Sequence, residues 1–308
     1  MGKLIIVGHK NPDTDSIVSA IAAQEFFSKL GTEAEARRAG EANNETRFIL
    51  ENVGIPMPGL AESLGEGETA VLVDHNEEGQ AFDQLAYEKV SHIIDHHKLS
   101  VKTEGPIYCR VEPVGSTSSL IAKMFFERKM DISGNAAKLL MAGILSDTLN
   151  LTSPTTTQED KDLLGELNKT AKIEIGSFVA EMFKAKSSLE GISVEDIIRV
   201  DYKTFEMGKR NVGIGTWETT LPESVNEKKE EIMEALSREK EAVGLDYIFF
   251  MVVDILKQNC QLYLVGEAEK ELAQKVFSGE MSNSEMFLVG VVSRKKQIVP
   301  QLTEALSK

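Results

Sequence analysis

The sequence predicts an α/β protein with two domains. The larger N-terminal domain would hold a doubly wound, mainly parallel sheet, and the smaller C-terminal α/β domain a mixed sheet. The chain of 308 residues suits two domains of ordinary size. Short apolar runs alternate with helical patterns through the first half, as in a parallel sheet. A polar stretch without periodicity, residues 187–192, predicts a linker between domains at 1–186 and 193–308.

Strands and helices are expected to alternate along the first domain. Apolar runs predict buried strands, and apolar residues spaced three and four apart predict helices. The expected strands are residues 4–7, 33–38, 70–73, 90–94 and 107–112, and the expected helices 17–30, 44–53, 120–129, 135–149, 158–168 and 175–185. Residues 157–160 read Thr-Gln-Glu-Asp, which predicts a capping box at the start of one of these helices.

The second domain carries more alternating patterns, which are typical of a mixed sheet. Strands are expected over residues 201–206, 211–217, 247–255, 262–265 and 286–292, and helices over 227–241, 269–277 and 298–306. The cleft between two such domains is the usual place for a ligand.

Composition excludes several classes of protein. The formal net charge of −15 opposes binding to nucleic acid or to an anionic membrane, because both depend on Lys and Arg. Apolar runs are too short to span a bilayer, and the N-terminus leads straight into a strand without a signal peptide. Cys109 and Cys260 have no metal or redox spacing, so we expect reduced packing residues in a cytoplasmic protein.

Acidic and imidazole side chains follow three of the predicted strands. The carboxyl ends of parallel strands lie at one edge of a sheet, where ligands bind. One further acid lies near the end of the helix predicted at 135–149, where it opposes the helix dipole. The candidate metal ligands are His9, Asp13, Asp15, Asp74, His96 and Asp147.

An alternative explanation exists for part of this set. Asp13 would also serve as a helix cap, and Asp15 as a favourable charge at a helix N-terminus. The recurrence of such residues after three strands favours the metal site, and all five histidines fall within the first 97 residues. Six ligands without cysteine suit two adjacent divalent ions in an open, catalytic site, and the mixture of His and Asp suits Mn²⁺, Co²⁺, Zn²⁺ or Fe²⁺.

The second domain offers the opposite charge. The run Ser293-Arg294-Lys295-Lys296 follows a buried strand and suits a compact phosphate, although taken alone it is better explained as an exposed basic run. Lys203 alone gives no functional signal. The turn at 115–118, Gly-Ser-Thr-Ser, is a possible anion site but more simply a helix cap.

These motifs together resemble the family II, manganese-dependent inorganic pyrophosphatases of the DHH phosphoesterase superfamily. The matching segments span nearly the whole chain without a departure, and the Asp-His-Asn-Glu and Ser-Arg-Lys-Lys-Gln forms are the most specific to these pyrophosphatases. They are residues 9–16 (HKNPDTDS), 74–77 (DHNE), 95–97 (DHH), 146–148 (SDT) and 293–297 (SRKKQ). The length leaves no room for an inserted regulatory nucleotide-binding module.

The resemblance implies a DHH metal-binding catalytic domain at 1–186 and a DHHA2-like substrate-binding domain at 193–308. One Mn²⁺ or Co²⁺ would be held by His9, Asp13 and Asp74. The other would be held by Asp15, Asp74, His96 and Asp147, with Asp74 bridging. Pyrophosphate would be bound by His97, which would also be a proton source, and from the second domain by Lys203, Ser293, Arg294 and Lys295. Asp95 would orient an imidazole ligand, and His75 and His92 would be structural.

The implied activity is that of an inorganic diphosphatase (EC 3.6.1.1). A metal-bridging hydroxide would attack one phosphorus atom in the cleft between the domains, with additional Mg²⁺ entering with the substrate. Domain closure is expected to assemble the site. The resemblance also implies a cytoplasmic homodimer.

Two other functions remain open at this stage. A DHH-type phosphodiesterase acting on short oligonucleotides or cyclic dinucleotides would use the same metal centre. However, the chain lacks the Gly-Gly-Gly-His stretch of those enzymes, and its aromatic content is only 6%. A non-catalytic phosphate or metal sensor would be expected to have lost a ligand, and all six are present.

Overall fold

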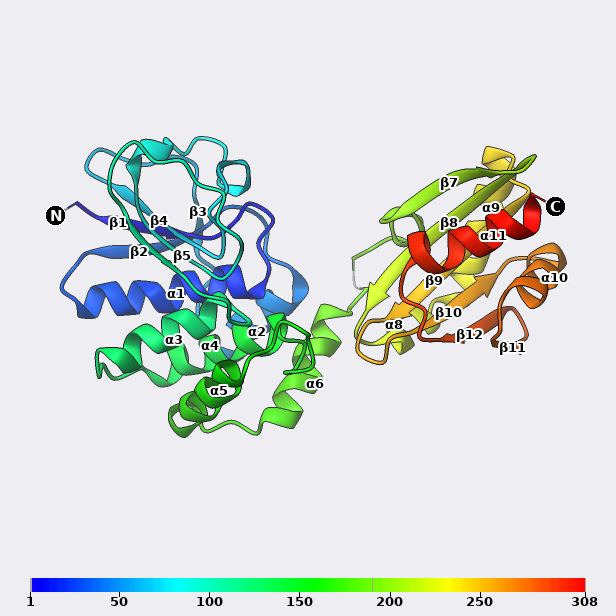
Figure 1. Ribbon diagram of the computed structural model, residues 1–308. Coiled ribbons are helices and arrows are strands. Elements are labelled where there is room, and N and C mark those ends of the chain that lie inside the picture. Colours follow the sequence, from blue (N-terminus) through cyan, green and yellow to red (C-terminus); the bar gives the residue numbers. More distant parts are fainter. Residues whose placement is uncertain (1, 190, 308) are drawn as a thin grey trace. The chain divides into compact units, whose positions relative to one another are not determined.

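The computed structural model describes residues 2–189 and 191–307. The chain forms two compact units, Met1–Lys186 and Ser187–Lys308 (Figure 1). The predicted linker at 187–192 includes residue 190, which lies outside the described residues. Its other residues form neither helix nor strand. The hydroxyl of Ser187 already bonds within the second unit, 2.9 Å from Thr219 Oγ1 and 3.0 Å from Thr220 Oγ1.

The first unit contains a six-stranded sheet in which every pairing is parallel. Its strand order is β3-β2-β1-β4-β5-β6, the doubly wound order with its reversal between β1 and β4. The predicted fold of this domain is therefore confirmed. The strands are β1 Leu4–Val7, β2 Ala34–Arg38, β3 Gly59–Leu60, β4 Thr69–Val73, β5 Val90–Asp95 and β6 Tyr108–Val111.

Six helices accompany this sheet, and four of them, α1, α3, α4 and α5, gather on one side of it (Figure 1). The helices are α1 Thr14–Lys29, α2 Asn44–Val53, α3 Thr117–Glu127, α4 Gly134–Asp147, α5 Gln158–Ala171 and α6 Ile175–Lys186. Two short 3₁₀ turns, η1 Glu78–Gln80 and η2 Tyr87–Lys89, lie between β4 and β5. The apolar strand β1 is fully buried, as predicted.

Helices α1 and α3 begin three residues earlier than predicted. Asp13 Oδ1 accepts a hydrogen bond from Ser16 N at 2.9 Å, and Ser116 Oγ accepts one from Ser119 N at 3.1 Å. These caps place polar, buried residues in the first turn, where an apolar pattern does not reveal the helix. The predicted capping box at the start of α5 is confirmed, since Thr157 and Asp160 satisfy each other's backbone N–H groups.

The second unit contains a mixed sheet in the order β11-β12-β10-β9-β8-β7. Only β8 and β9 run parallel among these neighbours, as the prediction of a mixed sheet requires. The strands are β7 Tyr202–Met207, β8 Arg210–Thr219, β9 Tyr247–Asp254, β10 Asn259–Leu264, β11 Glu280–Ser282 and β12 Glu285–Val289. The helices are α7 Val194–Arg199, α8 Pro222–Asn226, α9 Lys229–Val243, α10 Glu267–Val276 and α11 Val299–Leu306, with a π-helical turn η3 at Arg294–Ile298.

Both faces of this second sheet are buried. Alternate residues of β9 point to opposite sides, so that Phe249 and Met251 pack with α10 and α11 while Ile248 and Phe250 pack with α7 and α9. The continuous apolar run of β9 follows from this double burial. Strand β12 ends at Val289, three residues before the predicted end, because Gly290 adopts a left-handed backbone (φ 72°).

Two composition-based expectations have different outcomes. Cys260 is buried as predicted, but Cys109 on β6 is exposed, so the expectation that both are packing residues is wrong for Cys109. Within the described parts of the chain, none of the helices combines the length and apolar character that crossing a bilayer requires.

Replacing Leu140, which is fully buried in α4, by Ala should destabilise the first unit by about 2–5 kcal/mol, because the lost side chain leaves a cavity. Urea unfolding of the metal-free protein, followed by circular dichroism, measures this. Leu99→Ala is the control, since Leu99 is 58% exposed and should change stability by less than about 0.5 kcal/mol. Equal effects of the two substitutions would contradict the described core.

Candidate metal centre

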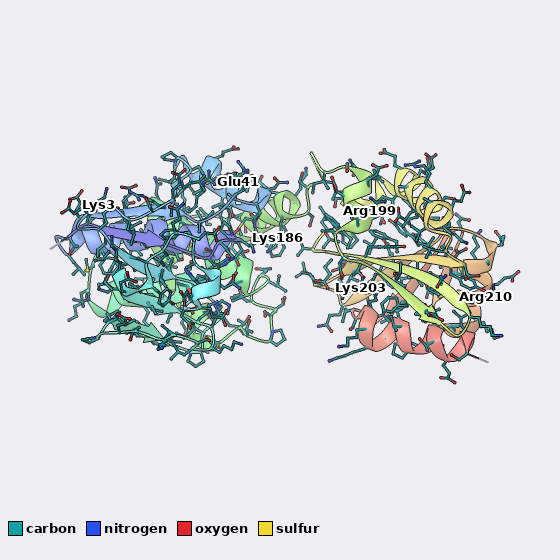
Figure 2. The ribbon with its side chains drawn as sticks, turned by 90° about the horizontal axis from the view of Figure 1, so that it is seen from above. Lys3, Glu41, Lys186, Arg199, Lys203 and Arg210 are labelled. Carbon is teal, nitrogen blue, oxygen red and sulfur yellow. The ribbon has the colours of Figure 1, made fainter. Side chains whose placement is uncertain are left out.

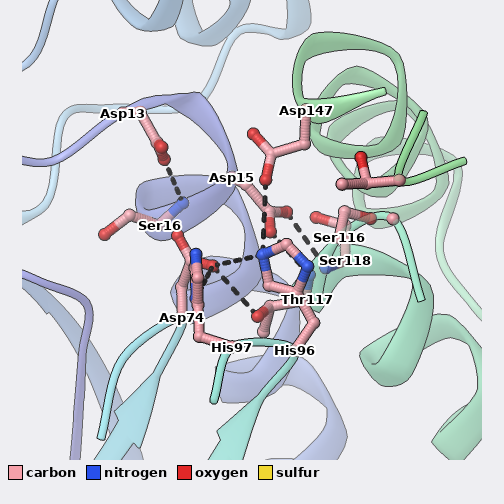
Figure 3. A network of polar contacts seen from close by, with 12 residues as sticks. Asp13, Asp15, Ser16, Asp74, His96, His97, Ser116, Thr117, Ser118 and Asp147 are labelled. Atoms are coloured by element: carbon pink, nitrogen blue, oxygen red, sulfur yellow. Dashed lines mark hydrogen bonds and ion pairs between the residues drawn. The ribbon is translucent and has the colours of Figure 1, made fainter. Parts of the chain in front are cut away.

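The candidate site lies where the strand order of the first sheet reverses. The loop after β1 carries His9 and leads into α1, and the chain after the neighbouring strand β4 begins with Asp74. Strand β5, next to β4, ends at Asp95 and is followed by His96 and His97. Because these strands are parallel, their carboxyl ends share one edge, and the six predicted metal ligands meet there. Figure 3 labels five of them, Asp13, Asp15, Asp74, His96 and Asp147.

The N-terminus of α1 supplies two carboxylates with different partners. Asp13 caps the helix through Oδ1 while its Oδ2 lies 3.7 Å from His9 Nε2, so the capping and the metal-binding explanations are compatible. Asp15 is fully buried and accepts hydrogen bonds from the backbone N–H groups of Thr117 (2.6 Å) and Ser118 (3.0 Å). Ser116 thus caps the N-terminus of α3. The same N-terminus also binds an anion, the Asp15 carboxylate.

Asp74 is the central acid of the site. Its carboxylate is buried, with Oδ2 3.4 Å from His9 Nε2 and Oδ1 3.4 Å from His96 Nε2. Thr117 Oγ1 donates a hydrogen bond to Oδ1 at 3.1 Å. The backbone of Asp74 is left-handed (φ 62°), a conformation that Asp tolerates better than most residues and that is common at functional sites.

Helix α4 brings the remaining acid. Asp147 is its last residue, and Asp147 Oδ2 lies 3.5 Å from His96 Nε2. One turn earlier, Gly143 allows α4 to approach Asp15. A Cβ atom at Gly143 would lie 2.1 Å from Ser118 Oγ and 2.6 Å from Asp15 Oδ1. A glycine is therefore required where α4 crosses the acids.

These side chains form donor groups that would hold divalent ions. Asp15, Asp74, His96 and Asp147 make one group, and His9, Asp13 and Asp74 make another; within each group the ligand atoms lie within 4.8 Å of one another. Asp74 belongs to both. Two buried atoms, Asp74 Oδ2 and His96 Nε2, have no hydrogen-bond partner among the described residues. Unpaired acceptors of this kind are what a bound cation satisfies, so the residues fit a pair of ions.

The crowding of these acids shifts their pKa values in the metal-free site. Burial and the neighbouring Asp74 raise the pKa of Asp15 to about 7. Burial, with Asp15, Asp13 and Asp74 nearby, also raises the pKa of Asp147 well above its usual range. The carboxylates therefore repel one another strongly enough to favour uptake of protons when no metal is bound.

The histidines respond in the opposite direction. Burial disfavours their charged form, but the nearby carboxylates of Asp13 and Asp74 raise the pKa of His9 to about 10, and those of Asp74 and Asp15 raise the pKa of His96 to about 9. Although burial of Asp74 opposes its charged form, the same two imidazoles hold its pKa below its usual range. Without metal, the protonated imidazoles of His9 and His96 thus supply the positive charge that bound cations would otherwise supply.

The other imidazoles have different surroundings. The half-exposed His97 places Nδ1 2.9 Å from Asp95 Oδ1, while His96 Nδ1 lies 3.1 Å from the carbonyl oxygen of Val114. Asp95 therefore orients His97, which forms a third possible donor group with Asp74 and His96. That Asp95 orients a metal-ligating imidazole stays a prediction. The ring of His96, a predicted ligand, is oriented by the backbone carbonyl of Val114. A cavity of about 250 Å³ lies beside His9, Asp74 and His97.

His75 and His92 were expected to be structural. Burial lowers the pKa of both. His75 Nδ1 lies 3.0 Å from the carbonyl oxygen of Val73, and the His92 ring packs edge-on against Phe27 at 5.2 Å.

In the second unit, Arg294 binds the end of the β7–β8 hairpin at which Lys203 lies. Arg294 Nη1 donates to the carbonyl oxygens of Asp201 (2.5 Å) and Ile214 (3.1 Å), and Nη2 lies 2.6 Å from Asp201 Oδ1. Ile214 is the cross-strand neighbour of Lys203. Figure 2 labels Lys203 at this end of the hairpin and Arg210 at the other. At least three of the five N–H donors of Arg294 are thus engaged, which fixes its guanidinium but reduces what remains for a ligand.

The two lysines of the basic run, Lys295 and Lys296, lie in the π-helical turn η3, which begins at Arg294. Lys295 and Lys296 are exposed, and Ser293 Oγ accepts a hydrogen bond from Lys296 N at 3.3 Å. Single π-helical turns are frequent at functional sites.

Family models match both halves of the chain. The model of the DHH family, N-terminal domain, matches residues 3–144, and that of the DHHA2 domain matches residues 180–305. A manganese-dependent inorganic pyrophosphatase from Methanocaldococcus jannaschii is 40% identical over 309 residues, which cover 97% of this chain and 98% of the relative. A protein from Clostridium acetobutylicum described as a probable manganese-dependent inorganic pyrophosphatase is 38% identical over 304 residues, 98% of each chain.

The chain belongs to the family II inorganic pyrophosphatases. A solved structure from Methanococcus jannaschii, described as belonging to the same family, is 39% identical with a TM-score of 0.65, and the match covers 99% of this chain and 100% of that one. An exopolyphosphatase-related protein from Bacteroides fragilis shares the fold at 15% identity, with a TM-score of 0.52 over 99% of this chain and 93% of that one.

In this family II chain, the sequence motifs located the acids and imidazoles but missed the residues that hold them. Thr117 and Ser118 bind the carboxylates of Asp15 and Asp74, and the only signal was the Gly-Ser-Thr-Ser turn, which was interpreted mainly as a cap. Whether the six residues bind metal remains a prediction, as do the roles of His97, Lys203, Ser293, Arg294 and Lys295.

Binding of Mn²⁺ should release protons, because His9 and His96 ligate only as neutral imidazoles and their pKa values of about 10 and 9 keep them protonated at pH 7. Protons compete with the metal, so the affinity should rise as the pH increases toward 9. Calorimetric titrations at pH 7 in two buffers with different ionisation enthalpies count the released protons.

The matched variants are His9→Gln and His92→Gln. The first should release fewer protons than the parent. The second should release the same number, because burial lowers the pKa of His92 and keeps it neutral. Identical heats in both buffers would contradict the assigned charge state.

Proposed function

We propose that this chain hydrolyses inorganic pyrophosphate to two phosphates, the reaction of an inorganic diphosphatase (EC 3.6.1.1). The observation that carries the proposal is the pair of donor groups that share Asp74. A shared carboxylate holds two ions a few ångströms apart, the arrangement that stabilises both the attacking and the leaving oxygen in phosphoryl transfer. Family membership points to the same reaction and to manganese as the metal.

Two Mn²⁺ or Co²⁺ ions would be held by the two groups. His9, Asp13 and Asp74 would hold one ion, and Asp15, Asp74, His96 and Asp147 the other. When bound, such ions lower the pKa of water and offset negative charge on phosphate oxygens. Additional Mg²⁺ would enter with the substrate.

The chain's own residues bind and orient the substrate in this proposal. His97 is suited to hydrogen-bond the leaving phosphate, since Asp95 holds its Nδ1 and raises its pKa, which favours the proton-donating form. Lys203, Ser293, Arg294 and Lys295 would bind phosphate oxygens with opposite charge and N–H or O–H donors. Asp201 fixes the Arg294 guanidinium in one orientation.

The division of labour between the domains is part of the proposal. Residues 1–186 would bind metal, residues 193–308 would bind substrate, and domain closure would bring the two functions to one pyrophosphate in the cleft. Small-angle scattering with and without a non-hydrolysable pyrophosphate analogue tests closure, and identical curves would exclude it.

A cytoplasmic location, a homodimer and the absence of nucleic-acid or membrane partners also belong to the proposal. Gel filtration with light scattering tests the dimer.

The direct test compares phosphate release from pyrophosphate with cleavage of a linear or cyclic dinucleotide, each with Mn²⁺. We expect turnover of pyrophosphate only. Preferential cleavage of a dinucleotide would favour a DHH-type phosphodiesterase, and tight pyrophosphate binding without turnover would favour a sensor.

Asp74→Asn should weaken both metal sites and abolish nearly all turnover. The amide keeps the size of the side chain and tolerates the left-handed backbone, but it lacks the charge needed to bridge two cations. Bound manganese is counted by elemental analysis after dialysis. Asp83→Asn, at an exposed acid of the same unit, should retain parent values. Loss of only one of two ions in Asp74→Asn would contradict the bridging role.

Arg294→Ala should raise KM for pyrophosphate about tenfold or more, since a charge-assisted hydrogen bond contributes about 1.5–3 kcal/mol. Bound manganese should be unchanged. The matched control is Arg210→Ala, because Arg210 is also bound to an acid (Asp246, 2.7 Å) but lies at the opposite end of the β7–β8 hairpin. Parent kinetics in Arg294→Ala would exclude its role in binding.

A further inference from the structure

A buried glutamate that is not itself a predicted ligand connects the two segments that carry Asp13, Asp15 and Asp147. Glu45 lies in the first turn of α2 and is fully buried. Its Oε2 accepts hydrogen bonds from Thr14 Oγ1 at 2.9 Å and from Ser146 Oγ at 2.8 Å. Thr14 stands between Asp13 and Asp15, and Ser146 immediately precedes Asp147. One carboxylate oxygen thus holds both α1 and α4 next to their acids.

Lys186 supplies the counter-ion. Its Nζ lies 3.2 Å from Glu45 Oε2 and donates to Ser146 Oγ at 3.2 Å. Lys186 is the last residue of α6 and of the first unit, and its side chain is one-third exposed; Figure 2 labels it at the end of that unit. A buried carboxylate without a neighbouring cation would be strongly unfavourable, so Lys186 is what makes Glu45 tolerable at this position.

The contacts of Glu45 are uneven. Its Oε2 has three donors, whereas Oε1 is buried and has no hydrogen-bond partner among the described residues. The geometry favours the two hydroxyls beside the acids over complete hydrogen bonding.

We propose that Glu45, with Lys186 as its counter-ion, is a positioning residue of the metal centre. It fixes the separation between the N-terminus of α1 and the C-terminus of α4 against the mutual repulsion of Asp13, Asp15 and Asp147. This inference rests on the proposed function, in which those acids hold metal. Residues that orient metal ligands typically change affinity about 10–100-fold when they are removed.

The test measures Mn²⁺ binding to the metal-free protein by calorimetry. Glu45→Gln keeps the size of the side chain but removes the charge that orients both hydroxyls. It should weaken Mn²⁺ binding by about 10–100-fold. The site of Asp15, Asp74, His96 and Asp147 should be affected more, because two of its four ligands come from the connected helix ends.

The chain contains a closely matched control. Glu269 in the second unit is also fully buried and is bound by one lysine, Lys240. One of its oxygens has no hydrogen-bond partner within the described part of the chain. No predicted metal ligand lies in that unit. Glu269→Gln should lower the melting temperature, because it also removes the charge of a buried glutamate. It should leave the Mn²⁺ binding isotherm unchanged. Equal Mn²⁺ affinity in Glu45→Gln and Glu269→Gln would overturn the proposal.

A second variant covers the case in which Glu45→Gln does not fold, which circular dichroism detects. Ser146→Ala changes no charge and removes the hydroxyl through which Glu45 holds the end of α4. It should weaken Mn²⁺ binding in the same direction. Parent affinity in folded Ser146→Ala would count against the proposal.

The outcome also separates this inference from the proposed function. A parent protein that binds Mn²⁺ and hydrolyses pyrophosphate, together with an unchanged isotherm in folded Glu45→Gln, would disprove the positioning role alone. A parent protein that binds no Mn²⁺ would disprove both.

Discussion

Repulsion among buried carboxylates is the constraint on which the first unit depends. Four acids, Asp13, Asp15, Asp74 and Asp147, converge at one edge of the sheet, and three of them belong to one cluster with His96. In water such groups would move apart, since like charges a few ångströms from each other are costly and burial increases the cost. The fold must therefore hold them together before any cation arrives.

Several kinds of contact meet this requirement. The N-terminus of α3 donates two backbone N–H groups to Asp15, where the helix dipole adds a favourable potential. Protonated His9 and His96 stand beside Asp74. Gly143 removes the side chain that would otherwise keep α4 away. Helices α1, α3 and α4 and the segments after β1, β4 and β5 thus all contribute to holding the acids together.

The sequence was informative about what is chemically distinctive and repeated. Apolar runs that end in acids and imidazoles identified β1, β4 and β5, and the same residues led to the family. It was uninformative where a residue's role depends on partners distant in the chain. Glu45 stands 101 positions from Ser146, and its pattern is that of an ordinary helix start. Asp95 adjoins two histidines, and only the fold decides that it binds His97 instead of His96. Cys109 lies on β6, the edge strand of the first sheet, where its side chain is exposed.

The left-handed backbone of Asp74 has a consequence for how ions would be received. The strain of that conformation, of the order of 1 kcal/mol, is present in the metal-free chain and is maintained by the surrounding sheet. The loop therefore does not need to refold when a cation arrives. If the site binds cations as proposed, the fold presents Asp74 to them already in its binding conformation, as a preorganised receptor does.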